Sequence, residues 1–114
     1  DECFIAAGIW HPESKSLNAI RQCIDENPNG YQKAVQILTQ AGFNMEGGKL
    51  IRPPKGFDKD HHLVEELKRK DFIAIKPISQ QQVCQADFVE YCQNELQHTV
   101  ALMAYLCFAL ELDY

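Results

Sequence analysis

The segment from Arg52 to His62 holds the densest group of side chains in this sequence that could do chemistry. Cationic groups, carboxylates and imidazoles lie close together in RPPKGFDKDHH, at Arg52, Lys55, Lys59, Asp58, Asp60, His61 and His62. Its two prolines and its glycine favour a fixed arrangement of these side chains. Cationic donors suit phosphate or carboxylate groups, and imidazoles titrate near neutral pH. We therefore expect binding or turnover of a small anionic or polar ligand at this loop, with the reaction itself left open.

A purely structural role for the same loop stays open beside this hypothesis. In that role Asp60 caps a following helix, Asp58 stabilises a turn, and Phe57 anchors the loop in the core. A metal site is disfavoured, because adjacent histidines on a helix point about 100° apart and no H-x-x-x-H or H-E-x-x-H pattern occurs. We predict neither a metal nor a cofactor.

A second candidate site lies at Trp10 and His11, directly after an apolar run that predicts a buried strand. Side chains at the end of such a strand often carry the chemistry of proteins with mixed helices and strands. His11 could act there as an acid or a base with Glu13 nearby. The alternative is structural: Trp10 packs at the strand end, His11 caps the next helix, and Glu13 complements the positive end of that helix.

The composition limits the partners. The chain of 114 residues carries 11 Lys and Arg against 16 Asp and Glu, a formal charge of −5, so nucleic acid is not an expected partner. The longest apolar run, residues 100–112, is shorter than the roughly 20 residues of a membrane span, so no membrane association is expected. The five cysteines form no C-x-x-C pair, and we interpret them as reduced thiols. A cytoplasmic location is the default expectation.

The first half of the chain predicts one strand, two helices and a hairpin. The strand spans residues 4–10, and helices follow Pro12 and Pro28, since proline suits a first helical turn. In the first helix Leu17, Ile20 and Ile24 recur at helical spacing, which leaves Lys15, Arg21 and Asp25 for the solvent side. Gly42 is expected to close the second helix, and Gly47 and Gly48 to form the turn of a hairpin between residues 43–45 and 49–51.

The second half predicts a short helix, a strand and a long C-terminal helix. The short helix spans residues 60–70 with Asp60 as its N-cap, and the strand spans 72–75. The long helix spans residues 87–112, with one continuous apolar stripe. Together these elements predict an α+β fold, in which a small, mainly antiparallel sheet packs against several helices.

Three segments resemble a known family. They are GIWHPE at residues 8–13, AIRQCIDENP at 19–28 and KLIRPPKGFDKDHHLVEELKRKDFIAIKPI at 49–78. They resemble domain of unknown function 2461, a family of conserved hypothetical proteins, over about residues 4–89. The resemblance implies a single domain that is the C-terminal half of a domain about twice this length, and it implies no activity.

The apolar strand begins within the first few residues of the chain. We therefore expect that part of the apolar surface of the domain is buried against other residues that this chain does not contain. Either the absent N-terminal half or a second copy of the chain would supply them. The alternative to a ligand-binding function is therefore a non-catalytic interaction module that uses the long C-terminal helix, with Leu106 as a contact residue.

Overall fold

A three-stranded antiparallel sheet forms the centre of the structure, a computed structural model that describes residues 3–111. The strands are β1 (Cys3–Ile9), β2 (Asn44–Glu46) and β3 (Phe72–Ile78), in the order β1-β3-β2. The α+β prediction is confirmed. Pro77 is tolerated inside β3 because β2 ends at the pair Asn44↔Ile75, which leaves Pro77 with a neighbouring strand on one side only.

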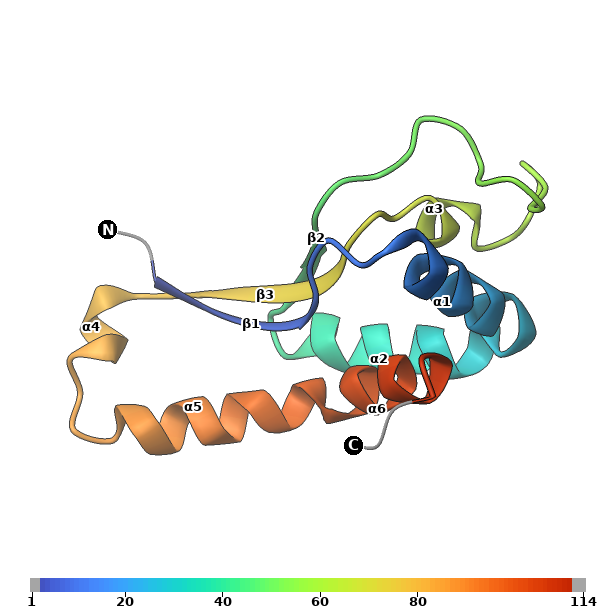
Figure 1. The fold of residues 1–114 in the computed structure, drawn as a ribbon. Coiled ribbons are helices and arrows are strands. Elements are labelled where there is room, and N and C mark those ends of the chain that lie inside the picture. Colours follow the sequence, from blue (N-terminus) through green and yellow to red (C-terminus); the bar gives the residue numbers. More distant parts are fainter. Residues whose placement is uncertain (1–2, 112–114) are drawn as a thin grey trace.

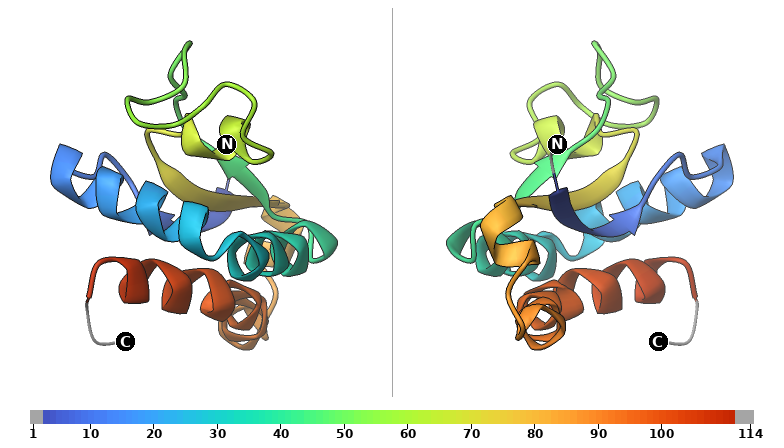
Figure 2. Two further views of the ribbon diagram at one scale, coloured as in Figure 1. Left: turned by 90° about the vertical axis from the view of Figure 1, so that its right-hand side faces the viewer. Right: turned by 90° about the vertical axis from the view of Figure 1, so that its left-hand side faces the viewer.

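Helices cover one face of the sheet (Figures 1 and 2). The covering helices are α1 (Ser14–Glu26), α2 (Pro28–Gln40), α5 (Phe88–Leu96) and α6 (Val100–Ala109), with the 3₁₀ turn η1 (Gln97–Thr99) between the last two. The short helices α3 (Val64–Leu67) and α4 (Gln80–Val83) lie beyond the two ends of β3 (Figure 1). The core lies between that face and α1, α2 and α6, and its fully buried side chains include Tyr31, Phe43, Phe72, Leu102 and Leu106. Leu106 therefore belongs to the core of its own domain, and the prediction that it contacts a partner is wrong.

The opposite face of the sheet has no helix against it among the described residues. Phe4 lies on that face, is 60 % exposed, and pairs across the strands with the exposed Pro77. Ala6 and Ile75 form the next pair on the same face, since alternate residues of a strand share a face. This surface is apolar along β1, and β1 is an edge strand.

One residue of α1 departs from the predicted pattern. Arg21 is only 5 % exposed, whereas the helical pattern left it for solvent. Its guanidinium donates to the carbonyl oxygens of Leu67 (2.7 Å) and Arg69 (3.1 Å), which come at the end of α3. The side chain thus ties α1 to α3, and the sequence of α1 does not say that α3 is the partner.

The predicted hairpin is wrong. Residues 44–46 pair with β3 and not with residues 49–51, which contribute only an isolated bridge between Lys49 and Arg69. The reason lies in Asp71, whose carboxylate accepts the N–H of Gly48 at 3.0 Å. A Cβ on Gly47 would lie 2.6 Å from the Cβ of Asp71, so the glycine is needed for this close approach and for its φ of 107°.

The third predicted helix is much shorter than expected. α3 spans only Val64–Leu67, and its N-cap position is Leu63, so the prediction that Asp60 caps it is wrong. The turns before α3 are held by other groups, since the His61 ring accepts the N–H of Leu63 at 3.0 Å. After Leu67 the chain has to turn into β3, which ends the helix before Lys70.

The C-terminal helical segment is present but bent. The predicted long C-terminal helix is confirmed, but η1 separates α5 from α6 within it, and the two helices point in different directions (Figure 2). The hydroxyl of Thr99 donates to the carbonyl of Leu96 at 2.6 Å within this turn. The bend changes which side chains face inward: Leu102, Tyr105 and Leu106 are buried.

Two polar contacts join the C-terminal segment to the rest of the fold. The Tyr105 hydroxyl lies 2.9 Å from the carbonyl oxygen of Cys23 and 2.8 Å from that of Asn27, so its hydrogen is shared between the two acceptors at the end of α1. The Lys76 ammonium donates to the Glu95 carboxylate at 2.8 Å and so links β3 to α5. Among the described residues, no helix combines the length and apolar character that crossing a membrane requires.

Candidate functional site

The predicted loop is not one compact array of charges. Arg52, Lys59 and Asp60 are exposed and have no side-chain hydrogen bond or ion pair within residues 3–111. The Asp58 carboxylate accepts the N–H of Asp60 at 3.1 Å, which is the turn role that the sequence left open. Lys55 is the predicted cation that lines a cavity described below.

His61 is held in one tautomer. Its Nδ1 accepts the N–H of Leu63, so the ring hydrogen is on Nε2, which donates to the Asp25 carboxylate of α1 at 2.8 Å. The His62 ring stacks on it, with centroids 4.9 Å apart. Within residues 3–111 no group of three or more His, Cys, Asp or Glu side chains is placed to hold a metal ion.

Trp10 and His11 lie at a different place in the fold. His11 has a φ of 54°, and its backbone N–H donates to the Asp71 carboxylate at 2.7 Å, while its side chain is 74 % exposed. Glu13 takes the N-cap position of α1, so the prediction that His11 caps this helix is wrong. No hydrogen bond or ion pair in the described part of the chain joins Trp10 or His11 to the loop.

The loop and α1 enclose a groove of about 680 Å³, which we name the α1–loop groove. Its lining residues are Ser14, Leu17, Asn18, Arg21, Gln22 and Asp25 of α1, Leu50 just before the loop, and Pro54, Lys55, Gly56 and Phe57 of the loop. Phe57 also packs against the core, and Pro54 is buried, so the loop is anchored where it forms the wall. The groove brings Lys55 together with residues of α1 that were not predicted as site residues.

Arg21 is the most unusual of these residues. Its guanidinium uses Nε and Nη2 for the two carbonyls of the α3 end, and it makes no ion pair with any residue in the range 3–111. Every fully buried side-chain polar atom of the described structure has a partner. Nη1 has none, so it keeps contact with solvent, and the groove is the cavity that Arg21 lines.

Burial lowers the pKa of Arg21 from its ordinary value, yet a guanidinium keeps its proton in proteins. A signal for this site was present in the sequence: Leu17, Arg21 and Ile24 share one helical face, because residues four and three apart are neighbours. A cationic side chain on that apolar face either has its charged group buried or extends past the face to solvent.

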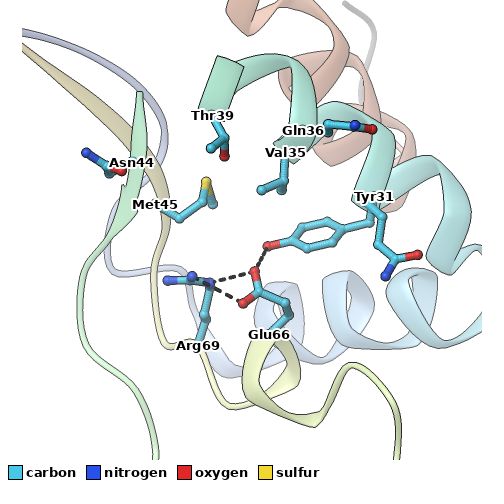
Figure 3. A pocket seen from close by; sticks show the side chains of 9 residues that line it. Tyr31, Val35, Gln36, Thr39, Asn44, Met45, Glu66 and Arg69 are labelled. Atoms are coloured by element: carbon cyan, nitrogen blue, oxygen red, sulfur yellow. Dashed lines mark hydrogen bonds and ion pairs between the residues drawn. The ribbon is translucent and has the colours of Figure 1, made fainter. Parts of the chain in front are cut away.

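A second cavity, of about 690 Å³, lies on the other side of α3, between α2 and β2 (Figure 3). It is lined by Tyr31, Gln32, Val35, Gln36, Thr39, Asn44, Met45, Glu66 and Arg69, and we name it the Tyr31–Arg69 pocket. None of these residues was predicted as a site residue. Tyr31 and Val35 were expected in the stripe of the second helix, where a polar function cannot be told from packing.

A hydrogen-bonded triad forms the floor of this pocket (Figure 3). The Tyr31 hydroxyl donates to Glu66 Oε1 at 2.7 Å, and Arg69 donates to both carboxylate oxygens, from Nε at 2.9 Å and from Nη2 at 3.2 Å. Burial raises the pKa of Tyr31 and the neighbouring Glu66 carboxylate raises it further, so the phenol is protonated and donates. Burial alone would lower the pKa of Arg69, but its hydrogen bonds to Glu66 raise it on balance.

One comparison with known proteins identifies relatives. The family model described as "Conserved hypothetical protein (DUF2461)" matches residues 1–105. The match covers most of the chain, and it extends beyond the residues 4–89 that carried the resemblance. No curated protein and no solved structure matches. The chain therefore belongs to the DUF2461 family of conserved hypothetical proteins, whose function is unknown.

Proposed function

We propose that the protein binds a small organic anion, a carboxylate or a phosphate monoester, in the α1–loop groove. The observation that carries the proposal is the buried guanidinium of Arg21, which has no acidic partner among the described residues, keeps Nη1 in contact with solvent, and belongs to a residue that lines the groove. A buried charge is ordinarily paired, so a ligand anion would supply the missing counter-charge. Two backbone carbonyls offset the desolvation of Arg21 only in part.

The charges of the lining favour an anion. Arg21 and Lys55 stand against one carboxylate, Asp25, whose Oδ1 is engaged by His61. Arg21 is buried on α1 and Lys55 is exposed on the loop, so the groove has one cation from each of the two elements that line it. Arg21 would donate to the anion in a fixed direction, and Lys55 would add a mobile charge.

The remaining lining favours a ligand with an apolar part. Leu17, Leu50 and Phe57 provide hydrocarbon surface, and Asn18 and Gln22 provide amide groups along the exposed edge of α1. The volume falls within the range of about 300–1,000 Å³ that small-molecule sites occupy. A carboxylate or phosphate on an aromatic or aliphatic body fits this combination better than a bare inorganic ion.

The test measures binding of phenyl phosphate and benzoate by amide chemical shifts of the ¹⁵N-labelled chain. Saturable shifts are expected at Asn18, Gln22 and Lys55. The variant Lys55→Gln removes one exposed cation and should weaken binding about fivefold, for a loss of about 1 kcal/mol. Lys59→Gln is the matched control, since Lys59 is in the same loop, is exposed and does not line the groove.

Equal weakening by both lysine variants would show that the effect is general electrostatics and not the groove. Absence of saturable shifts at these three residues with both anions would reject the proposal. A rise in ionic strength should weaken the binding, because one of the two cations is exposed.

The alternative function, an interaction module, is supported by the open face of the sheet. Phe4 is largely exposed on the edge strand β1, and the long helical segment keeps Val100 and Phe108 exposed while its inner residues are used by the core. β1 contains no charged residue, so two copies could pair edge to edge without like charges meeting. We propose a second copy of the chain as the partner in this case.

Sedimentation equilibrium tests the alternative. The wild type should dimerise, and Phe4→Glu should abolish dimerisation. Val89→Glu is the control, since Val89 is also exposed but lies at the start of α5, away from the open sheet face. A chain that is monomeric at millimolar concentration would remove this alternative.

A finer proposal about the family domain rests on the resemblance alone. We propose that this chain is the C-terminal half of a longer domain whose N-terminal half packs on the open sheet face. The mass of the natural gene product decides it: a product no longer than the 114 residues here would contradict the proposal.

A further inference from the structure

We propose that the Tyr31–Arg69 pocket is a second binding site, and that it takes a neutral ligand with an amide group, a carboxamide or lactam, joined to an apolar body. This inference is independent of the anion proposed for the α1–loop groove. The two cavities share no lining residue.

The charge of the pocket distinguishes it from the groove. Arg69 and Glu66 are its charged residues among those described, and they neutralise each other through two hydrogen bonds. An anionic ligand at Arg69 would meet the carboxylate of Glu66, and a cationic ligand at Glu66 would meet the guanidinium. A neutral ligand avoids both repulsions.

The ion pair nevertheless keeps unused hydrogen-bonding groups. Arg69 pairs with Glu66 through Nε and Nη2, and Nη1 makes no hydrogen bond with a residue in the range 3–111, so its hydrogens are available to an acceptor. The pair remains reachable, because the side chains of Arg69 and Glu66 are 10 % and 20 % exposed. Figure 3 shows the guanidinium lying between Glu66 and the β2 residues Asn44 and Met45.

A neutral carbonyl oxygen matches the free edge of Arg69, since it accepts two N–H groups without bringing a charge. An amide N–H on the same ligand group would find acceptors beside it. Glu66 Oε2 accepts one protein hydrogen bond and has capacity for another, and the Thr39 hydroxyl and Asn44 amide line the opposite rim. The donor and acceptor of an amide are thus both satisfied.

The walls of the pocket suit the apolar body of such a ligand. Val35 and Met45 face each other across the cavity above the triad (Figure 3). Met is flexible and polarisable, so it adapts to an aromatic ring. The Tyr31 hydroxyl donates its single hydrogen to Glu66, which fixes the carboxylate and leaves Arg69 as the donor to the ligand.

The test is an amide chemical-shift titration of the intact chain with benzamide and with benzoate, which have the same shape and differ in charge. Benzamide should cause saturable shifts at Gln36, Asn44 and Met45, with an affinity at least about tenfold higher there than benzoate. A third arm with N-acetylphenylalanine amide distinguishes the source of the amide: tighter binding than benzamide would indicate a peptide ligand, and weaker binding a small carboxamide.

The variant Gln36→Trp tests the location. Gln36 is exposed on α2 and lines the pocket, so a tryptophan there should occupy the cavity and reduce benzamide binding at least about tenfold. Gln40→Trp is the control, since Gln40 is exposed on the same helix and does not line the pocket. Circular dichroism of both variants verifies that α2 is intact.

Benzoate binding as tight as benzamide at these residues, no saturable shift with benzamide, or full binding by Gln36→Trp would each overturn the inference. The experiments can reject the anion site in the α1–loop groove and the amide site in the Tyr31–Arg69 pocket independently of each other. Benzoate shifts at Asn18 and Gln22 report the groove, whereas benzamide shifts at Asn44 and Met45 report the pocket.

Discussion

Replacement of Arg21 by methionine tests how a buried cation without an acidic partner is held. Met keeps most of the aliphatic stem and removes the guanidinium, so the hydrogen bonds to the carbonyls of Leu67 and Arg69 are lost. Hydrogen bonds from a charged donor contribute about 1.5–3 kcal/mol each, or about 3–6 kcal/mol for two. Removal of a buried charge returns part of this, because its desolvation cost of several kcal/mol disappears.

We expect a net loss of about 2 kcal/mol in the free energy of unfolding for Arg21→Met. For a domain of this size that corresponds to a decrease in Tm of about 8 °C. Urea unfolding followed by far-UV circular dichroism measures the loss, with an unchanged dependence on urea concentration if the unfolded state is unaffected. Phenyl phosphate should stabilise the wild type and not the variant, if the anion binds next to Arg21.

Lys15→Met is the matched control. It removes the same charge and adds the same side chain on the same helix, but Lys15 is exposed and makes no hydrogen bond or ion pair with the described residues. Its effect should stay within about 0.5 kcal/mol. If Arg21→Met were as stable as this control, the guanidinium would not tie α1 to α3 and the reasoning would be refuted.

Two further predictions concern the stability contributed by the Tyr105 hydroxyl and by the Asp71 carboxylate. Tyr105→Phe should lose about 1–2 kcal/mol, because the two carbonyls at the end of α1 lose their shared donor, and an unchanged urea midpoint would contradict this bond. Burial tends to raise the pKa of Asp71, but the backbone N–H groups of Gly48 and His11 lower it on balance. A lowered pKa gives stability that is present above the ordinary pKa of about 4 and is lost as pH falls through the folded value. Asp71→Asn should therefore show a smaller decrease in stability below pH 4 than the wild type, whereas the exposed Asp60→Asn should behave like the wild type.

Local signals in the sequence predicted several elements correctly. Pro28 begins α2, and Gly42 follows its end with a φ of 95°. Each of these depends on a few neighbouring residues, whose conformational preferences act within one turn. The apolar run of residues 4–10 was likewise sufficient to predict a strand.

Predictions were wrong where the local conformation is set by contacts with residues far away in the sequence. Gly47 and Gly48 have the composition of a hairpin turn, yet they serve a close approach to Asp71, which lies more than twenty residues further along. Asp60 has the composition of an N-cap, yet the chain before α3 is organised by His61 and its bond to Asp25. The sequence contains these residues but not their distances.

The candidate sites show the same division. The sequence by itself determined that a charged, proline-rich loop exists, that the fold is α+β, and that the chain resembles the family to which it belongs. Only the tertiary structure decided which charges meet: it placed Arg21 and Lys55 on one groove, left Arg52 and Lys59 in solvent, and joined Tyr31 to Glu66 and Arg69. Helical periodicity reports which side of an element is apolar, whereas a binding site needs the position of one element relative to another. That position is set by the packing of the whole core.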